Sequence, residues 1–255
     1  MIVSLQGGLG NQLFGYAFGR SWPRLHGGEL FFDKTSFDTD PLRKYQLNAY
    51  GLDPQFAYPA APYYHEPDMT FHPEVWDLPR ETSFKGYWQN EKYFSADLMR
   101  KKFQIPRGLP NQKCRELSER IIVIPNSCFV GVRRADYLTP ERIDYHGVMP
   151  LRYYIEAARR MPHDAKYFVF TDDIPWCREN FRDDWEIVDV NNKDEKAWDI
   201  WLMSLCTHAI IANSTFHWWG CYLGADKFKG TIVAPKLWFA NGLKTEIVPA
   251  RWHTI

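Results

Sequence analysis

Hydrophobic residues in the first part of the chain fall into short apolar runs separated by a stretch with helical spacing. An apolar run at 2–5 is followed by a glycine-rich turn at 7–10, a helical stretch at 12–25 and a second apolar run at 29–33. This order predicts a strand, a loop, a helix and a second strand. It is the opening of a nucleotide-binding type of α/β sheet.

The second half alternates more regularly. Apolar runs rich in β-branched and aromatic residues predict strands at 127–132, 166–171, 208–212 and 230–234, the last being the expected final strand. Helical spacing predicts helices at 112–122, 151–161 and 195–206, and one more that begins near Phe216. Such alternation predicts a second α/β domain with a parallel sheet.

The segment between these halves differs in composition. Residues 53–82 are rich in proline and aromatic residues, so we expect them to be mostly irregular and to face an acceptor. The domain boundary is expected within 105–125, where helix breakers cluster at Pro106, Gly108 and Pro110. We therefore expect an N-terminal domain of residues 1–115 and a C-terminal domain of residues 116–255.

Bulk composition narrows the function classes. The 255 residues include 31 Lys and Arg balanced by 31 Asp and Glu, which argues against a nucleic-acid-binding surface. Five scattered cysteines without CxxC spacing argue against a disulfide framework or a structural zinc site and favour a reducing compartment. No signal peptide pattern opens the chain, and no run approaches the ~20 apolar residues of a membrane span. A soluble cytoplasmic protein is expected, with most of its 11 tryptophans in the core.

Two adjacent arginines, Arg133 and Arg134, stand where the predicted strand 127–132 ends, with Asp136 close behind. Ligands of α/β sheets bind at the carboxyl ends of strands. The rigid N–H fork of arginine matches phosphate oxygens two at a time. The alternative is a solvated turn. It is less favoured, because similar polar junctions follow other predicted strands.

Two of these junctions carry acidic or hydroxyl side chains. The pair Asp172 and Asp173 can accept hydrogen bonds from ribose hydroxyls or guanine N–H groups, or it can cap the helix that follows. The run Asn213-Ser214-Thr215 can cap the next helix, or it can present hydroxyl and N–H groups to anionic oxygens. Both interpretations stay open for each junction.

The glycine-rich loop ends in Gly10, Asn11 and Gln12, and it lets backbone N–H groups approach a phosphate or sugar closely. Its spacing is close to that of a dinucleotide fingerprint, but Leu13 stands at the third glycine. A nicotinamide oxidoreductase is therefore disfavoured.

A divalent metal site is not expected. The pair Asp38 and Asp40 has the spacing that bridges a metal ion to a diphosphate, yet it lies between Phe37 and Pro41 rather than at the end of an apolar strand. A solvated turn is the better interpretation, and no other ligand cluster is visible in the sequence.

Together these motifs resemble the α-1,2-fucosyltransferases of glycosyltransferase family 11 along the whole chain. The opening GGLGNQLF combined with NSTFHWWG is more specific to this family than the double-arginine motif, which occurs widely in fucosyltransferases. The resembling segments are Gly7–Phe14, Tyr16–Gly19, Gly86–Phe94, Val132–Tyr137, Thr171–Asp173 and Asn213–Gly220.

The resemblance implies a GT-B fold, in which two Rossmann-like domains face each other across a cleft and the C-terminal half binds GDP-fucose. It implies inverting, metal-independent transfer of L-fucose to the 2-hydroxyl of a terminal galactose by a bacterial, cytoplasmic enzyme. Association with membrane-bound glycan precursors and the oligomeric state stay open. The alternatives are another nucleotide-sugar-dependent glycosyltransferase and a weakly active glycan-binding protein.

The resemblance also implies roles for single residues. Arg133 meets the charge that develops on the β-phosphate, and Arg134 orients its loop by pairing with a carboxylate, for which Asp136 is the candidate. Asn11 faces fucose and acceptor across the cleft. Acceptor binding falls to Tyr87, Trp88 and Gln89. Donor binding falls to Gly10, Gln12, Arg133, Arg134, Asp172, Asp173, Asn213, Ser214, Thr215, Phe216 and His217.

The base that deprotonates the acceptor hydroxyl has three candidates. Asp136 and Glu141 are the nearby carboxylates, and Glu141 stands at an offset that resembles the base position of core α-1,6-fucosyltransferases. The third option is that the departing phosphate takes the proton.

This chain departs from the family pattern at three positions. Gly131 stands where the family usually has His, Ala135 where it has Gly, and His217 where it has Ser. Gly131 removes a contact to the donor, which His217 replaces if it faces the cleft. On an ordinary β backbone, Gly131→His is then expected to raise turnover or donor affinity. If Gly131 instead has a positive φ or another chain segment approaches it closely, His is expected to clash and to lower both stability and activity.

Overall fold

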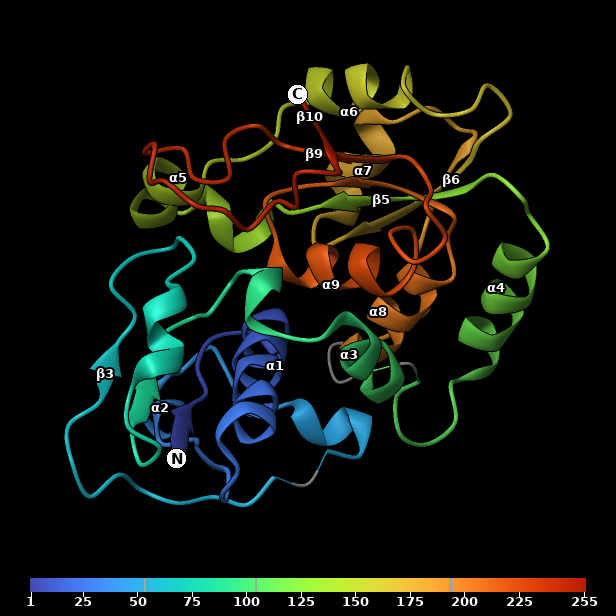
Figure 1. Ribbon diagram of the computed structural model, residues 1–255. Coiled ribbons are helices and arrows are strands. Elements are labelled where there is room, and N and C mark those ends of the chain that lie inside the picture. Colours follow the sequence, from blue (N-terminus) through green and yellow to red (C-terminus); the bar gives the residue numbers. More distant parts are fainter. Residues whose placement is uncertain (53, 104, 193–194) are drawn as a thin grey trace. The chain divides into compact units, whose positions relative to one another are not determined.

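The computed structural model describes residues 1–52, 54–103, 105–192 and 195–255, in which the chain forms two compact units (Figure 1). The first unit contains 1–107 and 244–249, and the second contains 108–243 and 250–255. A division after residue 115 would cut through helix α4 (Gln112–Ile122). The division into domains 1–115 and 116–255 that fold independently stays a prediction.

A four-stranded parallel sheet in the order β2-β1-β4-β3 forms the centre of the first unit. Its strands are β1 (Ile2–Ser4), β2 (Phe31–Asp33), β3 (Tyr64–His65) and β4 (Ser83–Lys85). Helix α1 (Leu9–His26) connects β1 to β2 and buries one aromatic face, at Phe14, Phe18 and Trp22. The remaining helices are α2 (Ser36–Thr39), α3 (Ala96–Lys102) and the 3₁₀ helices Leu47–Tyr50, Pro73–Asp77 and Glu91–Tyr93.

The predicted strand, helix and strand at the start of the chain are confirmed in kind. The proline-rich region 53–82 holds two short elements, β3 and the 3₁₀ helix Pro73–Asp77, so it is irregular over most of its described length, as expected. Strand β4 was not predicted, because its sequence Ser-Phe-Lys has a single apolar residue and forms no apolar run.

A six-stranded parallel sheet in the order β10-β9-β8-β5-β6-β7 forms the second unit. The order means that β5 pairs with β8 on one side and β6 on the other, and all six of its residues are buried. The strands are β5 (Ser127–Val132), β6 (Lys166–Thr171), β7 (Trp185–Ile187), β8 (His208–Ile211), β9 (Ile232–Ala234) and β10 (His253–Thr254).

Helices cover both faces of this sheet, with α6 and α7 on one face and α8 and α9 on the other (Figure 1). Side chains alternate along β5, so Cys128 and Val130 pack toward Tyr154 of α6, whereas Gly131 faces α9. The helices after α4 are α5 (Pro140–His146), α6 (Leu151–Ala158), α7 (Ile174–Asn180), α8 (Lys196–Ser204) and α9 (Thr215–Leu223).

Three details of the second half differ from expectation. Strand β7 was not predicted. The strand at 230–234 is not the last one, because the chain returns to add β10 beside β9 at its C-terminal end. Helix α5 was not predicted, because its seven residues face largely outward and carry no apolar stripe. Eight of the eleven tryptophans are buried, which confirms the expected aromatic core.

All five cysteines are buried free thiols. Within the described ranges, no helix combines the length and the hydropathy that a membrane crossing needs.

Candidate functional site

The carboxyl edge of the second sheet brings together the polar junctions that follow β5 and β6. Arg133 Nη1 lies 2.8 Å from Asp172 Oδ2, and the backbone N–H of Arg134 donates to Asp172 Oδ1 at 2.8 Å. Arg134 Nε donates to Asp173 Oδ2 at 3.1 Å. Parallel strands end at the same edge, which is why residues about 39 positions apart become ion-pair partners.

Asp136 binds other arginines than the one expected. Its carboxylate lies 2.5 Å from Arg133 Nη2 and 2.5 Å from Arg142 Nη1. The predicted pair of Arg134 with Asp136 is therefore wrong. Arg134 instead pairs with Asp173, and its guanidinium lies 4.0 Å from the centroid of the Trp176 ring. The pairing differs because the 3₁₀ helix Ala135–Leu138 turns Asp136 back toward Arg133, three positions before it.

The cluster is balanced in charge. Three arginines, at 133, 134 and 142, face three aspartates, at 136, 172 and 173. Both terminal nitrogens of the Arg133 guanidinium contact carboxylates in this structure, Nη2 that of Asp136 and Nη1 that of Asp172. The same ion pairs hold the Arg133 side chain, which is 25% exposed, in a defined position.

Asp173 caps a helix, as one of its two interpretations predicted. Its Oδ1 accepts the backbone N–H of Trp176 at 3.2 Å in the first turn of α7. Asp172 and Asp173 each use two of the roughly four acceptor positions of a carboxylate in these contacts. Asp172 and Asp173 thus keep acceptor positions that these contacts do not use. That a nucleoside binds to them stays a proposal.

The Asn213-Ser214-Thr215 run does not cap α9 through its side chains. Asn213 is buried and donates from Nδ2 to the carbonyl oxygens of His146, at 2.6 Å, and Trp238, at 3.0 Å. Ser214 is the N-cap residue by position, but its hydroxyl makes no capping hydrogen bond. The side chain of Asn213 therefore anchors two neighbouring loops to the end of β8.

His217 and Gly131 contact each other directly. A Cβ atom placed on Gly131 would lie 2.4 Å from Cγ of His217, so the imidazole fills the space that a β5 side chain would take. The ring is 4% exposed, and burial, with help from the charges of Arg133 and Lys196, lowers the pKa of His217 to about 3. His217 is thus neutral at physiological pH, and its Nδ1 has no hydrogen-bond partner among the described atoms.

The carboxyl edge of the first sheet holds the glycine-rich loop. Gln12 is fully buried and its amide is fully used, because Nε2 donates to the carbonyl oxygens of Gly7 and Lys44 and Oε1 accepts the N–H of Gln46. Gly7 has φ +70°, a conformation that favours glycine. Gln12 therefore shapes this loop, and Gly10, buried at the start of α1, supports its turn.

The predicted acceptor residues separate into exposed and buried positions. Tyr87 is 37% exposed, and Gln89 Nε2 donates to Asn11 Oδ1 at 3.0 Å. The ring of Trp88 is completely buried and stacks on Phe18, with centroids 4.1 Å apart. Tyr87 is therefore exposed at this edge and Asn11 is half-buried, whereas the Gln89 side chain is buried at 6% exposure and holds Asn11.

The two carboxylates considered as bases have different surroundings. Asp136 lies between the guanidinium groups of Arg133 and Arg142. Glu141 is exposed in the first turn of α5.

Sequence patterns missed one carboxylate, Glu66. It directly follows β3, and burial raises its pKa to about 7. Its position just before Pro67, in a region read as irregular, concealed it. The signal that could have found it is an acidic residue directly after the Tyr-Tyr-His run at 63–65.

The Asp38 and Asp40 pair does form a turn. Asp38 belongs to the short helix α2, and Asp40 Oδ1 accepts the N–H groups of Leu42 at 2.8 Å and Arg43 at 3.0 Å. In the part of the chain that the structure describes, no group of three or more His, Cys, Asp or Glu side chains is placed to hold a metal ion.

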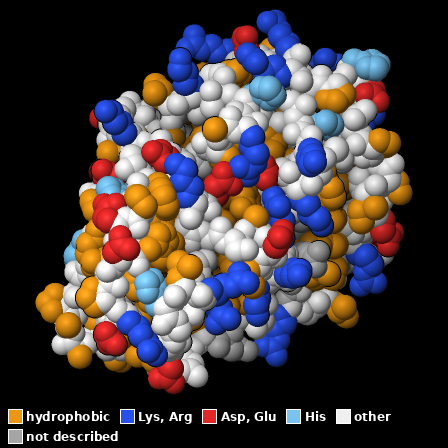
Figure 2. All heavy atoms as spheres, in the orientation of Figure 1, with side chains coloured by type: hydrophobic (Ala, Val, Ile, Leu, Met, Phe, Trp, Pro, Cys, Tyr) orange, Lys and Arg blue, Asp and Glu red, His pale blue; other side chains and the backbone are white. Residues whose placement is uncertain are grey.

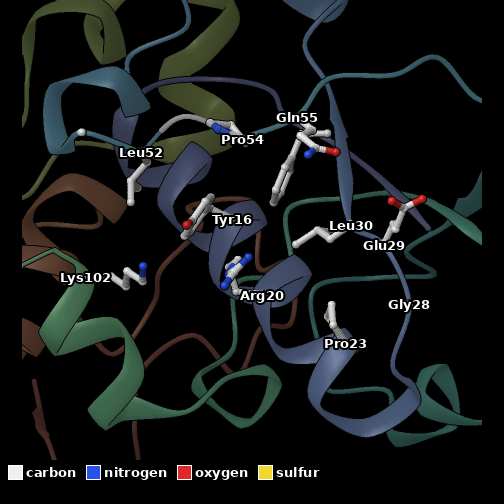
Figure 3. Close-up of a pocket in the computed structure, with 12 residues that line it drawn as sticks. Tyr16, Arg20, Pro23, Gly28, Glu29, Leu30, Leu52, Pro54, Gln55 and Lys102 are labelled. Atoms are coloured by element: carbon white, nitrogen blue, oxygen red, sulfur yellow. The ribbon is translucent and has the colours of Figure 1, made fainter.

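A cavity of about 450 Å³ lies elsewhere in the first unit (Figure 3). Arg20 and Tyr16 of α1 line it together with Glu29, Gln55 and Lys102. It contains none of the predicted site residues. Charged side chains of both signs are spread over the face of the protein seen in Figure 2, in keeping with the zero net charge.

Comparison with known proteins identifies relatives of the chain. The sequence profile of glycosyl transferase family 11 matches residues 56–255. An α-1,2-colitosyltransferase of Escherichia coli is 32% identical over 94% of this chain and 92% of that protein. The galactoside α-(1,2)-fucosyltransferase 1 of Bos taurus is 36% identical, over 39% of this chain and 31% of that protein.

Among solved structures, the fucosyltransferase NodZ from Bradyrhizobium is similar to this fold, with a TM-score of 0.52 at 15% sequence identity. The similarity covers 88% of this chain and 92% of that one. At this identity the similarity shows the fold alone.

Proposed function

The chain belongs to glycosyltransferase family 11, and we propose that it transfers L-fucose from GDP-fucose to the 2-hydroxyl of a terminal galactose, with inversion and without a metal ion. Its fold is of the GT-B type. The observation that carries the proposal is the similarity to an α-1,2-transferase over 94% of the chain. The galactoside acceptor is supported by the names of the mammalian α-1,2-fucosyltransferases that match part of it.

In this proposal the second unit binds the donor. Arg133 stabilises the negative charge that grows on the leaving diphosphate, because its guanidinium is held in place before the reaction begins. Ser214, Thr215 and Phe216, at the start of α9, lie beside the diphosphate. Asp172 and Asp173 accept hydrogen bonds from the guanosine with the acceptor positions that Arg133 and Arg134 leave open.

The first unit binds the acceptor. Tyr87, Gln89 and Asn11 are the side chains proposed to contact the galactoside, the last two already joined by a hydrogen bond. The proton of the acceptor hydroxyl passes to Glu141 or to the departing phosphate. Asp136 is the weakest of the three candidates, because its carboxylate oxygens already contact Arg133 and Arg142.

A second donor has specific support. The E. coli relative that aligns along nearly the whole chain is named a colitosyltransferase. Colitose is the 3-deoxy analogue of L-fucose, so the two GDP-sugars differ by one hydroxyl group. A site that hydrogen-bonds that hydroxyl rejects the analogue strongly, whereas an apolar site discriminates weakly.

The test is GDP release from GDP-fucose and GDP-colitose over a panel of galactose-terminated acceptors, with product linkage assigned by NMR. We expect acceptor-dependent release and an α-1,2 product. Galactoside binding without any GDP release would favour a glycan-binding protein instead. Equal stabilisation of the protein by GDP and UDP would contradict the guanosine site, because a ligand stabilises the fold according to its affinity.

Metal independence and location are part of the same proposal. Activity is expected to survive EDTA, and abolition by EDTA with rescue by Mn²⁺ would overturn it. We also propose that the enzyme works in the cytoplasm on glycan precursors. Fractionation of cells that express the tagged chain tests this location.

A further inference from the structure

A strained turn, Gly86–Asn90, follows β4 in the first unit. Trp88 has φ +55°, a conformation that is rare for a bulky aromatic residue. In the described residues only Lys229 shares a positive φ among residues other than glycine. Strain of this kind persists where surrounding contacts over-determine it, and it concentrates at functional sites.

Glu66 supplies those contacts. Its Oε2 accepts the backbone N–H of Tyr87 at 2.6 Å, and both of its oxygens lie 3.1 Å from the backbone nitrogen of Trp88. One carboxylate thus binds two successive N–H groups of the turn. Hydrogen bonds to an ionised acceptor are stronger than neutral ones, so this contact is well suited to hold a strained backbone.

Gly86 makes the approach of Glu66 possible. A Cβ atom on Gly86 would lie 2.4 Å from Cβ of Glu66 and 2.6 Å from its Oε2. Gly86 does not have a positive φ, so backbone freedom is not the reason for a glycine here. A glycine is needed because the Glu66 side chain occupies the space that a Cβ atom would take.

The turn places the side chains that the proposed function assigns to the acceptor. Tyr87 is exposed on one side of Trp88, and Gln89 binds Asn11 on the other. The Trp88 ring is locked in the core against Phe18, so the turn is fixed at its centre from both the backbone and the side chain.

We propose that Glu66 is a positioning residue for the acceptor. Its carboxylate holds the Gly86–Asn90 turn, so that exposed Tyr87 and half-buried Asn11, which buried Gln89 holds, present a fixed surface to the galactoside. This inference rests on the proposed function only for the identity of the ligand. The contact between Glu66 and the turn is independent of it.

The contact is pH-sensitive within the physiological range. Burial raises the pKa of Glu66 to about 7, and the charge of Asp68 adds to the rise. Hydrogen bonds from the backbone N–H groups of Trp88 and Tyr87, and the charge of His72, lower the pKa and offset part of this rise. Tyr93 also lies within electrostatic reach of Glu66. Since the carboxylate is the stronger acceptor, the hold on the turn weakens as the pH falls below about 7.

The kinetic test compares three variants. Glu66→Gln removes the charge at nearly constant shape, and Gly86→Ala pushes the side chain away. Glu74→Gln is the control, because Glu74 is 61% exposed and its carboxylate contacts His72 rather than the turn. We expect the first two to raise the acceptor KM about tenfold, the effect of weakening one charge-assisted hydrogen bond, and to leave the donor KM unchanged.

In the native enzyme, the acceptor KM is expected to rise as the pH falls from 8 to 6, and Glu66→Gln is expected to remove this dependence. If the acceptor KM of Glu66→Gln still depends on pH, the dependence belongs to His72, and this result would contradict the proposal. An unchanged acceptor KM, or an equal rise of both KM values, would also overturn it.

A measurement without substrate separates this inference from the proposed function. The backbone amide resonances of Tyr87 and Trp88 are expected to titrate with a midpoint near pH 7 in the native protein and to lose this step in Glu66→Gln. Absence of the step refutes the contact whatever the enzyme transfers. If the step is present but no acceptor supports GDP release, the proposed function fails and the contact stands.

Discussion

The contact between Gly131 and His217 shows how one side chain takes the place of another. Gly131 lies on an extended central strand where any residue fits the backbone, but the His217 ring occupies the room for a side chain. The expectation that Gly131→His improves the enzyme is therefore corrected. The backbone at Gly131 is extended, as that expectation required, but the His217 ring occupies the space of the new side chain.

We predict that Gly131→Ala lowers stability by about 1–3 kcal/mol, the usual cost of overpacking a core. Melting temperature measures it. His217→Ser frees the space, so the double variant Gly131→Ala/His217→Ser is expected to be more stable than the sum of the single changes. Strict additivity would show that the ring moves aside freely. Gly8→Ala is the control, because the nearest atom to its added Cβ is 3.9 Å away.

Arg133 differs from Arg134 in what surrounds it. Arg133→Lys is expected to lower kcat by about 10²–10³-fold with a smaller change in donor KM, because one ammonium cannot replace two forked contacts to growing charge. Steady-state kinetics and the melting temperature are both needed, since Arg133 also holds Asp136 and Asp172. Near-normal turnover in Arg133→Lys would place this side chain outside the reaction. Arg134→Lys, which alters a pair with Asp173, is expected to keep part of the activity.

Helix α7 depends on a residue that also belongs to the charged cluster. Asp173 accepts the N–H of Trp176 as the cap of α7 and pairs with Arg134. Asp173→Asn keeps an effective cap and loses the ion pair, whereas Asp173→Ala loses both. We predict that the alanine variant is less stable than the asparagine variant by about 1 kcal/mol, measured by denaturant unfolding. Equal stability of the two variants would mean that the cap is not needed.

The two units are linked by a segment that returns late in the chain. Residues 244–249 belong to the first unit although the second unit separates them from it in sequence. Thr245 pairs with Met69, Glu246 accepts from Asn90 and Lys92, and Ile247 is buried at 1% exposure.

We predict that Ile247→Ala destabilises the first unit by about 2–5 kcal/mol through the cavity it leaves. Hydrogen exchange by mass spectrometry is expected to show the loss of protection in residues 1–107 and little change in β5 and β6. Leu243→Ala, at an exposed position, is the control. Loss of protection confined to the second unit would contradict the assignment of this segment.

Much of the fold could be predicted from local pattern. Strands β5, β6 and β8 were recognisable as short apolar runs, and helices α4, α6 and α8 from apolar residues at helical spacing. Short elements such as β3, β4 and β10 carry no period, and parallel pairing with distant strands is what makes them strands.

The residues of the candidate site were also visible as polar runs after strands, because parallel strands send their carboxyl ends to one edge. The partner of each residue was not visible. Asp136 reaches Arg133 through a 3₁₀ turn, the His217 ring reaches Gly131 from a neighbouring helix, and Glu66 reaches the turn after β4. The first contact is local and depends on the 3₁₀ turn forming. The other two join residues that are distant along the chain, so hydrogen bonding and burial in the folded chain alone decide them.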